Sequence, residues 1–336
     1  MFKEIMTTDK NINGESSAID LVLRPSSWNE YVGQEKVKSQ LRVILDAAKK
    51  RGEVSDHLLF YGQAGLGKTT LAHLVAKEMG VNLKITAGPT LEKVGDLAAI
   101  LTNLENGDVL FIDEAHRINK MTEEVLYPAM EERKLNLMVG KGPSARSLAL
   151  DLPAFTLIAA TTRASLLSGP LRSRFGASFK LDYYENKDIE SILKRSSEVL
   201  NVKIDKGGLE LLAKASRFTP RTANRLLKRM RDYALVLDTP IVNAEVIKKT
   251  LDLLEIDHLG LEPYDRRLIE TIIKKFKGGP VGVSTLAAAL NDDRGNIEEV
   301  HEPYLMSIGL IQRTPSGRVV TDLGYEHLGI DRFSVI

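Results

Sequence analysis

The sequence predicts an α/β P-loop domain, in which helices flank a parallel sheet, followed by a small all-helical domain and a C-terminal winged-helix domain. Three observations support this fold class. Short apolar runs alternate with amphipathic stretches over residues 58–183, helical spacing alone fills residues 184–256, and three helical stretches precede a hairpin pattern within residues 257–336. Alternation of strand and helix is typical of a parallel sheet covered on both faces. We therefore divide the chain at 1–183, 184–256 and 257–336, and expect residues 1–19 to form a polar, mobile arm.

Composition excludes several classes of protein. The 336 residues include no cysteine, so disulfide bonds, thiolate metal sites and thiol nucleophiles are ruled out. No apolar run is long enough to span a bilayer, and the first residues lack the apolar core of a secretory signal, so we expect a cytoplasmic protein with no membrane contact. The formal net charge of +1 points neither toward nucleic acid nor away from it. Any DNA site must therefore be a local patch of positive charge.

The stretch GQAGLGKT, residues 62–69, fits the pattern G-x-x-x-x-G-K-[ST] at every fixed position. It lies between an apolar run and a helical stretch, as the motif requires, and this context disfavours a chance glycine-rich turn. Glycines let the backbone N–H groups turn toward phosphate oxygens, and the helix that follows adds its positive N-terminal end. We expect Lys68 to reach the β- and γ-phosphates of a nucleotide and Thr69 to ligate Mg²⁺. The glycines of this stretch are Gly62, Gly65 and Gly67.

Two further apolar runs end in polar residues that suit phosphate chemistry. VLFID ends at Asp113, which we expect to hold Mg²⁺ through water, and the adjacent Glu114 is placed to polarise the attacking water. The alternative is an acidic strand end without a metal. FTLIAATT ends at Thr161 and Thr162, where a hydroxyl could bond the lytic water or the γ-phosphate, although threonine is common at strand ends. We interpret His116 as a packing residue.

Helix start signals organise the rest of the chain. Thr219 before Pro220 predicts a helix N-terminus, because proline is favoured at the first helical position. In the last segment, Ser284 is the expected N-cap of the second helix, and Pro303 should kink or restart the third. IQRTPSGRVVT then predicts two short strands around a Pro-Ser-Gly turn. Three helices followed by a hairpin are the pattern of a winged helix-turn-helix.

Residues 133–152 carry a second hairpin pattern, inserted between two strands of the sheet. Leu135, Leu137 and Val139 alternate with Asn136 and Met138, a Gly-Lys-Gly-Pro turn follows, and leucines alternate again on the return strand. The apolar face of this hairpin is either covered by the sheet or exposed as a patch for a partner.

Two pairs of arginines have no acidic partner nearby in the sequence. In SGPLRSRFG no acid lies within four residues of Arg172 or Arg174. In RTPSGR, no acid separates Arg313 from Arg318, and we expect both guanidinium groups at the wing tip, where they suit DNA phosphates. Arg294 is added to these candidate DNA contacts. Because the C-terminal segment holds more acidic than basic residues, a protein-docking or purely structural winged helix remains the alternative.

The order of the motifs resembles one known family. LRPSSWNEYVGQEKV precedes the P-loop, and DEAH, AATTRA, GPLRSRFG and TPRTANR follow it in turn. Over about residues 20–330 this order closely resembles the RuvB family of bacterial branch-migration motors, which are AAA+ ATPases. The resemblance implies ATP hydrolysis that drives branch migration of Holliday junctions in DNA recombination and repair. It also implies ATP/ADP and Mg²⁺ as cofactors, a hexameric ring on duplex DNA, docking of RuvA on the hairpin 133–152, and RuvC in a larger complex.

The same resemblance assigns roles to residues that the nucleotide of one subunit would meet. Leu23 and Arg24 lie where the family's adenine pocket begins, and Tyr184 begins the lid near the nucleotide. Thr70 joins the ligands of phosphate and metal. Thr162 corresponds to the sensor-1 residue, and Arg221, in TPRTANR, to the sensor-2 arginine that brings the lid onto the γ-phosphate.

A ring would also place residues beside the nucleotide of the neighbouring subunit. We expect Arg174 to be an arginine finger, with Phe175 and Gly176 fixing its backbone and Arg172 bracing the loop. The EER stretch is expected to border the same nucleotide. Its residues are Glu131, Glu132 and Arg133.

Two other functions share part of this pattern. A clamp-loader-like AAA+ machine or a protein remodeller would have the ATPase half, but its expected ending is not a winged helix with an RTPSGR wing. A nucleotide-gated transcription regulator would read a DNA sequence with its third C-terminal helix. That stretch, NIEEVHEPYLMSIGL, carries three acids and no arginine, so it suits groove reading poorly.

Overall fold

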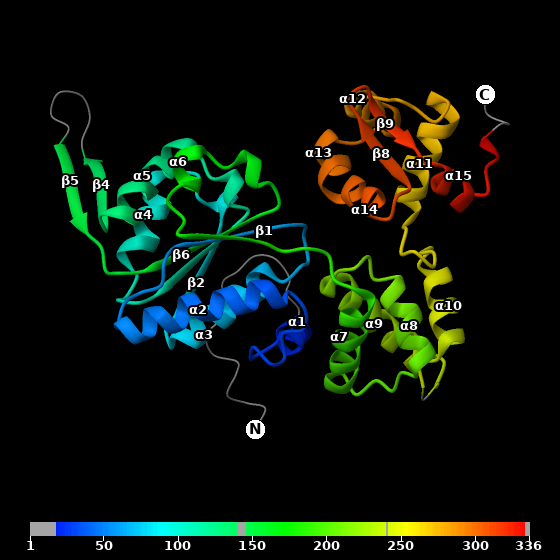
Figure 1. The fold of residues 1–336 in the computed structure, drawn as a ribbon, viewed down its shortest axis with the longest axis horizontal. Helices are drawn as coiled ribbons and strands as arrows, with labels where there is room; N and C mark the ends of the chain where they lie inside the picture. Colours follow the sequence, from blue (N-terminus) through cyan, green and yellow to red (C-terminus); the bar gives the residue numbers. More distant parts are fainter. Residues whose placement is uncertain (1–17, 140–145, 240, 333–336) are drawn as a thin grey trace.

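The computed structural model describes residues 18–139, 146–239 and 241–332, which form three lobes (Figure 1). Most of the expected N-terminal arm and the Gly-Lys-Gly-Pro turn lie outside the described residues. The predicted fold class is confirmed: a parallel sheet flanked by helices is followed by a helical lobe and then by a winged helix. None of the described helices is long and apolar enough to cross a membrane.

The first lobe is built on a sheet in which five of the described strands pair in parallel, in the order β2-β3-β6-β1-β7. The central strands β3 and β6 are apolar almost throughout, as expected for strands that are covered on both faces. The strands are β1 Leu58–Tyr61, β2 Leu83–Ala87, β3 Val109–Asp113, β6 Thr156–Thr161 and β7 Ala177–Lys180.

Two helical layers cover this sheet. On one face, α2 and α3 pack against residues such as Phe60 and Phe111, and on the other face α4, α5 and α6 pack against residues such as Leu59 and Leu110. Neighbouring residues of each strand therefore belong to different cores, because successive side chains of a β-strand point to opposite faces of the sheet. The helices of this lobe are α1 Ala18–Leu23, α2 Glu35–Arg51, α3 Lys68–Met79, α4 Val94–Thr102, α5 Lys120–Glu131 and α6 Gly169–Arg172.

The inserted segment is a hairpin, as predicted. Strands β4 Lys134–Val139 and β5 Arg146–Asp151 pair antiparallel and project from the first lobe beside α5 (Figure 1). Leu135 is fully buried, Leu137 and Leu150 are half-buried against the same core, and Leu148 remains 45% exposed. The base of the hairpin is thus covered by its own domain, and exposed apolar surface begins further out.

The described part of the second lobe consists of helices, with a single parallel bridge between Ile204 and Val242, and shares a core with the first lobe. Tyr31 and Leu66 of the first lobe belong to the same apolar cluster as Tyr184, Ile189 and the lid helices. The predicted start of α9 is confirmed, because the Thr219 hydroxyl accepts the N–H of Thr222 and Pro220 is the first helical residue. The helices are α7 Asn186–Val199, α8 Lys206–Lys214, α9 Pro220–Val236 and α10 Ala244–Leu253.

The third lobe is a winged helix with its own core. An ordinary helix resumes at Glu302 after a π-helical turn over Ile297–His301, so the predicted restart near Pro303 is confirmed. The predicted N-cap Ser284 is wrong. The chain is fixed by paired backbone bonds between Val281 and Arg318, of 3.0 and 2.8 Å, and the helix begins directly afterwards with Gly282 as its N-cap. The elements are α11 Pro263–Phe276, α12 Val283–Leu290, α13 Arg294–Asn296, α14 Glu302–Ser307, β8 Ile311–Thr314, β9 Gly317–Val320 and α15 Asp322–His327.

Candidate functional site

The phosphate-binding loop lies between β1 and α3, where the sequence predicts it. Gly62, Gly65 and Gly67 all have positive φ angles, of 145°, 81° and 98°. A Cβ atom at Gly62 would lie 2.4 Å from the Leu181 carbonyl oxygen, and one at Gly65 would lie 2.9 Å from the Cβ of Arg221. Glycine is therefore required here both by backbone conformation and by the close approach of the lid. The loop is a cradle of backbone N–H groups that suits phosphate.

Lys68 is the first residue of α3 and is buried. Its Nζ donates to the carbonyl oxygens of Gly62 and Gln63, each at 2.8 Å, so the ammonium group is held over the loop. Burial lowers the pKa of Lys68 to about 8; the negative charge of Asp113 opposes this effect and the positive charge of Arg221 adds to it. Lys68, Asp113 and Arg221 therefore form one electrostatic group although they come from three separate segments.

The acidic pair lies at the carboxyl end of β3. Asp113 ends the strand, and its Oδ1 accepts the N–H of Glu114 at 2.9 Å. Glu114 adopts a left-handed conformation, and its exposed carboxylate pairs with Arg117 at 3.0 Å. Arg117 was not among the predicted site residues, although its i,i+3 spacing from Glu114 was a usable signal.

The two threonines at the end of β6 differ in burial and in hydrogen bonding. The Thr161 hydroxyl is buried and already engaged: it accepts the N–H of Arg163 at 2.9 Å and lies 2.9 Å from Nδ1 of His116. Thr162 is half-buried and makes no side-chain hydrogen bond among the described residues, so it is the threonine available to a ligand. His116 joins the ends of β3 and β6, and burial lowers its pKa. The packing role expected for His116 therefore includes a specific polar contact.

The lid side of the site is held by aromatic hydroxyls. Tyr184 is buried, and its hydroxyl lies 3.2 Å from both the Tyr31 hydroxyl and the Leu66 carbonyl oxygen of the P-loop. Burial raises the pKa of Tyr184 to about 12. The Arg221 N–H lies 3.4 Å from the Gly65 carbonyl oxygen, so the start of α9 rests on the same loop. Tyr31 was missed by the sequence analysis because a single tyrosine in YVGQ carries no spacing signal.

Residues at the expected adenine side are also close to the lid. Leu23 is buried at the end of α1, and its carbonyl oxygen accepts a bond of 2.9 Å from Arg195 of α7. The Arg24 guanidinium contacts His73 of α3. Thr69 and Thr70 are half-buried in the first turn of α3. Leu23 and Arg24 therefore lie against α7 and α3, whereas Thr69 and Thr70 directly follow the P-loop.

The arginine loop has an acidic partner that its local sequence does not reveal. Within the subunit Arg174 does have an acidic partner, since its Nη2 lies 3.0 Å from Glu131 Oε2; Nη1 donates to the Pro170 carbonyl oxygen at 2.7 Å, and the guanidinium lies 4.5 Å from the centre of the Tyr127 ring. Glu131 is 43 residues away in the sequence, so local spacing could not reveal it. Arg172, expected to brace the loop, is exposed and has no side-chain partner among the described residues. Glu132 and Arg133 are exposed beside Glu131.

The wing requires a correction. Arg318 is not at the wing tip: it is 5% exposed, and its guanidinium pairs with Glu302 at 2.8 Å and Glu298 at 3.1 Å. Arg313 is directly opposite Arg318 in the hairpin but is 58% exposed, with Glu298 at a distance of 4.0 Å. Opposite residues of an antiparallel pair share one face, and the acids of α14 and the preceding turn lie beneath it. Arg294 is exposed and pairs with Glu298 at 3.2 Å.

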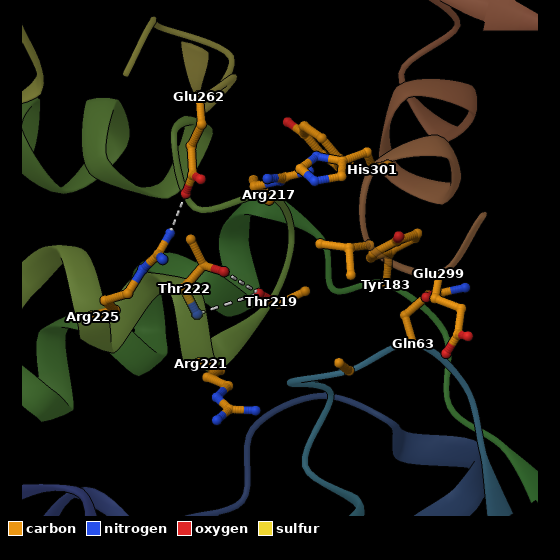
Figure 2. Close-up of a pocket in the computed structure, with 13 residues that line it drawn as sticks. Gln63, Tyr183, Arg217, Thr219, Arg221, Thr222, Arg225, Glu262, Glu299 and His301 are labelled. Carbon is orange, nitrogen blue, oxygen red and sulfur yellow. Dashed lines mark hydrogen bonds and ion pairs between the residues drawn. The ribbon is translucent and has the colours of Figure 1, made fainter. Parts of the chain in front are cut away.

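A cavity of about 260 Å³ opens where the three lobes meet (Figure 2). Gln63 of the P-loop, Arg221 of the lid and Glu299 of the winged helix all line it. Beside it, Arg163 pairs with Glu299 at 2.5 Å and thus joins the end of β6 to the winged helix. Side chains from all three lobes therefore meet beside the P-loop, at Gln63 and Ala64.

The residues present fit a magnesium nucleotide. The Thr69 hydroxyl and the Asp113 carboxylate are hard oxygen donors of the kind that Mg²⁺ prefers, with most of its other ligands being water and phosphate. Among the described residues no group of three or more His, Asp or Glu side chains could hold a metal by protein ligands alone.

The chain matches three family models in succession. The P-loop domain of the Holliday junction DNA helicase RuvB matches residues 23–181, the RuvB AAA lid domain matches 184–257, and the RuvB C-terminal winged helix domain matches 258–329.

Relatives match over nearly the whole chain. A Holliday junction branch migration complex subunit RuvB from Dehalococcoides mccartyi (strain CBDB1) is 52% identical over 328 residues, which is 98% of this chain and 94% of the relative. The structure of a Thermotoga maritima RuvB Holliday junction branch migration motor is 48% identical, covers 92% of this chain and 99% of its own, and aligns with a TM-score of 0.86. A single-residue variant of that Thermotoga protein aligns with a TM-score of 0.84.

Proposed function

This chain belongs to the RuvB family of Holliday-junction branch-migration motors, and from that premise we propose that ATP hydrolysis by this chain drives the migration of four-way DNA junctions. The observation that carries the proposal is the convergence of a P-loop, a lid arginine and a winged helix on one cavity within a single chain. A change at the nucleotide in the first lobe could therefore be transmitted through direct contacts to the winged helix, which would hold DNA.

The chemical roles follow from the geometry of the loop. Lys68, held over the loop at 2.8 Å from two carbonyl oxygens, exchanges those contacts for phosphate oxygens. Glu114 orients and polarises the attacking water, and Thr162 offers its hydroxyl to the water or the γ-phosphate. Arg221 supplies positive charge from the lid. Thr69 and Asp113 would hold Mg²⁺, which would supply positive charge to neutralise the phosphates.

The assembly we propose is a hexameric ring around duplex DNA, with RuvA docked on the hairpin 133–152 and RuvC in the larger complex. Family membership supports the ring, and the exposed Leu148 on a projecting hairpin supports the docking site. In the ring, Arg174 reaches the nucleotide of the neighbouring subunit, where an arginine finger is worth about 10³–10⁵ in rate in other nucleotidases. The exposed EER stretch borders the same nucleotide.

The other functions weighed from the sequence receive no support. A clamp loader, a protein remodeller or a sequence-reading regulator would share the P-loop domain, but the lid and the winged helix both match RuvB models. No separate observation favours any of these alternatives.

The deciding experiment is branch migration of a synthetic four-way junction, measured by strand exchange with and without RuvA. The intact chain should migrate the junction in the presence of MgATP, and Glu114→Gln should bind ATP while hydrolysing it about 10²–10⁴ times more slowly. If the chain hydrolysed ATP but exchanged the strands of no junction, even with RuvA present, the proposed function would be contradicted. Normal hydrolysis by Glu114→Gln would contradict the role of that carboxylate alone.

A further inference from the structure

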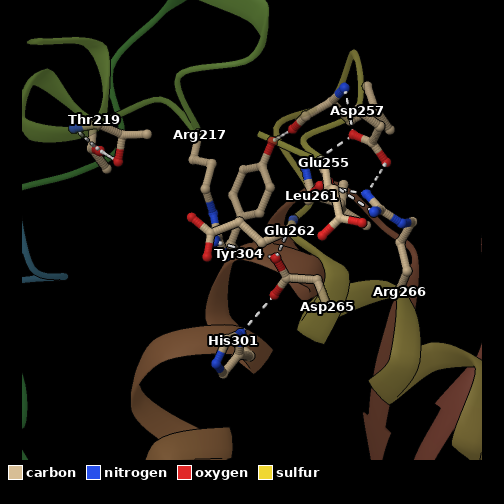
Figure 3. Close-up of polar contacts among 12 residues, drawn as sticks. Arg217, Thr219, Glu255, Asp257, Leu261, Glu262, Asp265, Arg266, His301 and Tyr304 are labelled. Atoms are coloured by element: carbon tan, nitrogen blue, oxygen red, sulfur yellow. Dashed lines mark hydrogen bonds and ion pairs between the residues drawn. The ribbon is translucent and has the colours of Figure 1, made fainter. Parts of the chain in front are cut away.

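The loop that precedes α9 is clamped by the winged helix. Arg217 is the residue before Phe218, and its guanidinium lies 3.3 Å from Asp265 of α11 and 4.6 Å from the centre of the Tyr304 ring of α14 (Figure 3). The Phe218 ring also packs against Tyr304, at 5.9 Å between ring centres, and belongs to the border of the winged-helix core. Two consecutive side chains of the lid are thus held by the third lobe.

Asp265, the carboxylate that pairs with Arg217, lies in a buried, hydrogen-bonded position. Its side chain is fully buried, its Oδ2 accepts the N–H of Glu262 at 2.9 Å, and its Oδ1 lies 2.7 Å from Nδ1 of His301. A buried carboxylate needs both hydrogen bonds and a compensating charge. Arg217, whose side chain is only 12% exposed, brings that positive charge from the lid.

The backbone of the loop is strained. Arg217 and Phe218 both have left-handed conformations, with φ of 52° and 54°, although neither is glycine. Such conformations persist when surrounding contacts over-determine them. Here those contacts include Asp265 and Tyr304 of the winged helix, and Tyr183, whose ring centre lies 6.3 Å from that of Phe218, so the winged helix helps to hold the shape of the loop.

The same loop positions the nucleotide contacts of the lid. Thr219, the next residue, caps α9, and the N–H of Arg221 two residues later lies 3.4 Å from the Gly65 carbonyl oxygen of the P-loop. The Phe218 carbonyl oxygen accepts the N–H of Tyr184 at 3.0 Å, and the Tyr184 hydroxyl lies 3.2 Å from the Leu66 carbonyl oxygen. A movement of the loop would shift both Arg221 and Tyr184 relative to the phosphates.

We infer that Arg217 is a positioning residue that couples the winged helix to the nucleotide site: held by Asp265 and Tyr304, it fixes the loop that sets Arg221 over the P-loop. The inference rests on the proposed function, because it takes the winged helix as the DNA-binding lobe and the P-loop as the ATPase site. When DNA load displaces the winged helix, the displacement passes through Arg217 to the lid arginine. By reciprocity, nucleotide binding changes the affinity for DNA through the same contact.

The test uses the full-length chain and compares wild type with Arg217→Met, which keeps the aliphatic length but removes the charge. The coupling is measured in two ways. The first is the ratio of the KM values for MgATP with and without saturating fluorescent duplex. The second is the ratio of the Kd values for the duplex with and without MgATPγS. Coupling factors of this kind are typically about 5–150-fold. We expect both ratios to fall to within about twofold of one in Arg217→Met, while duplex Kd without nucleotide stays near the wild-type value.

Arg225→Ala is the matched control. Arg225 also joins the lid to the winged helix, through a bond of 2.7 Å to Glu262, but it is exposed and does not touch the strained loop. This variant should keep the wild-type coupling. If Arg217→Met does not fold, Arg217→Met with Asp265→Asn carries the same test, because it leaves no unpaired buried carboxylate.

The outcomes separate the inference from the proposed function. Wild-type coupling in Arg217→Met, equal loss in Arg225→Ala, or a wild-type chain that hydrolyses ATP and binds DNA without coupling would each overturn the inference alone. A wild-type chain that binds no duplex would overturn the proposed function itself.

Discussion

Burial gives the amino group of Lys68 a property that an exposed lysine lacks. Its pKa is lowered from 10.5 to about 8, so in the free protein the side chain titrates close to physiological pH. Between about pH 8 and pH 10.5, Lys68 binds more protons in the unfolded chain than in the folded chain. In this pH range Lys68 therefore makes the free energy of unfolding rise with pH. Below pH 8 both states are protonated, and the cost of burying the charge is fully present.

A nucleotide should reverse this depression, because phosphate charge favours the protonated lysine. We expect ATP binding to take up a proton above pH 8, and the Kd for ATP to rise by up to about tenfold per pH unit in that range. Titration calorimetry in buffers of different ionisation enthalpy measures the uptake. Lys68→Arg, whose guanidinium stays charged, should take up no proton, and absence of uptake by the wild type would contradict the low pKa.

Arg318 and Arg313 illustrate how neighbouring arginines of one hairpin serve different purposes. Arg318→Ala would leave the buried Glu302 without its cation, and we expect a loss of about 3–5 kcal/mol in the stability of the winged helix. Chemical denaturation of the full chain measures it. A variant as stable as wild type would show that Glu302 is compensated by other groups.

Arg313→Ala should instead leave stability unchanged, because its side chain is 58% exposed. We expect it to weaken binding equally on unrelated duplexes and to reduce the slope of log affinity against log salt by about one per engaged subunit. Affinities at several salt concentrations on two duplexes decide the matter. A loss confined to one sequence would indicate base reading rather than a phosphate contact.

At the scale of the element, the hairpin of β4 and β5 divides into a packed base and an exposed outer part. Leu135→Ala should cost about 2–5 kcal/mol, since its side chain is fully buried in the core beside α5. Leu148→Ser should preserve stability and intrinsic ATPase, yet weaken RuvA binding by about five- to thirtyfold. The two variants are compared by denaturation and by RuvA affinity. Unchanged RuvA affinity in Leu148→Ser would place the docking surface elsewhere.

The sequence predicted those features of the fold and the site that depend on residues close together in the chain. The P-loop, the cap at Thr219 and the strand end at Asp113 depend on residues within a few positions, and all lie where the sequence places them. The acidic partners of Arg174 and Arg318 could not be predicted, because they are 43 and 16 residues distant, beyond any spacing rule. Ser284 failed for a similar reason, since a long-range backbone pairing fixes where α12 begins. The contacts that join the lobes, such as Arg217 with Asp265, had no sequence signal.

At the scale of the whole molecule, the position of Arg174 bears on assembly. In the isolated subunit its guanidinium is occupied by Glu131, the Pro170 carbonyl oxygen and the Tyr127 ring, with a side chain that is 20% exposed. An arginine finger must exchange such contacts for the phosphates of a neighbour. Of these contacts, the pair with Glu131 is worth about 0–1 kcal/mol, because the Glu131 side chain is 55% exposed, so loss of this pair costs little.

Mixing two inactive variants tests whether Arg174 acts on a neighbouring subunit. Lys68→Ala lacks the phosphate-binding lysine but keeps the finger, and Arg174→Ala has the opposite defect. In a ring of heterologous interfaces, random mixing of equal amounts should give about a quarter of interfaces with both residues intact, so the mixture should recover ATPase that neither variant has alone. Arg172→Ala, in the same loop but exposed and without a partner among the described residues, should retain most activity and serves as the control. Subunit exchange is verified by resonance energy transfer between labelled variants. Mixed rings without recovered ATPase would exclude Arg174 as the finger, because any residue that completes a neighbour's site must restore turnover when paired with an intact P-loop.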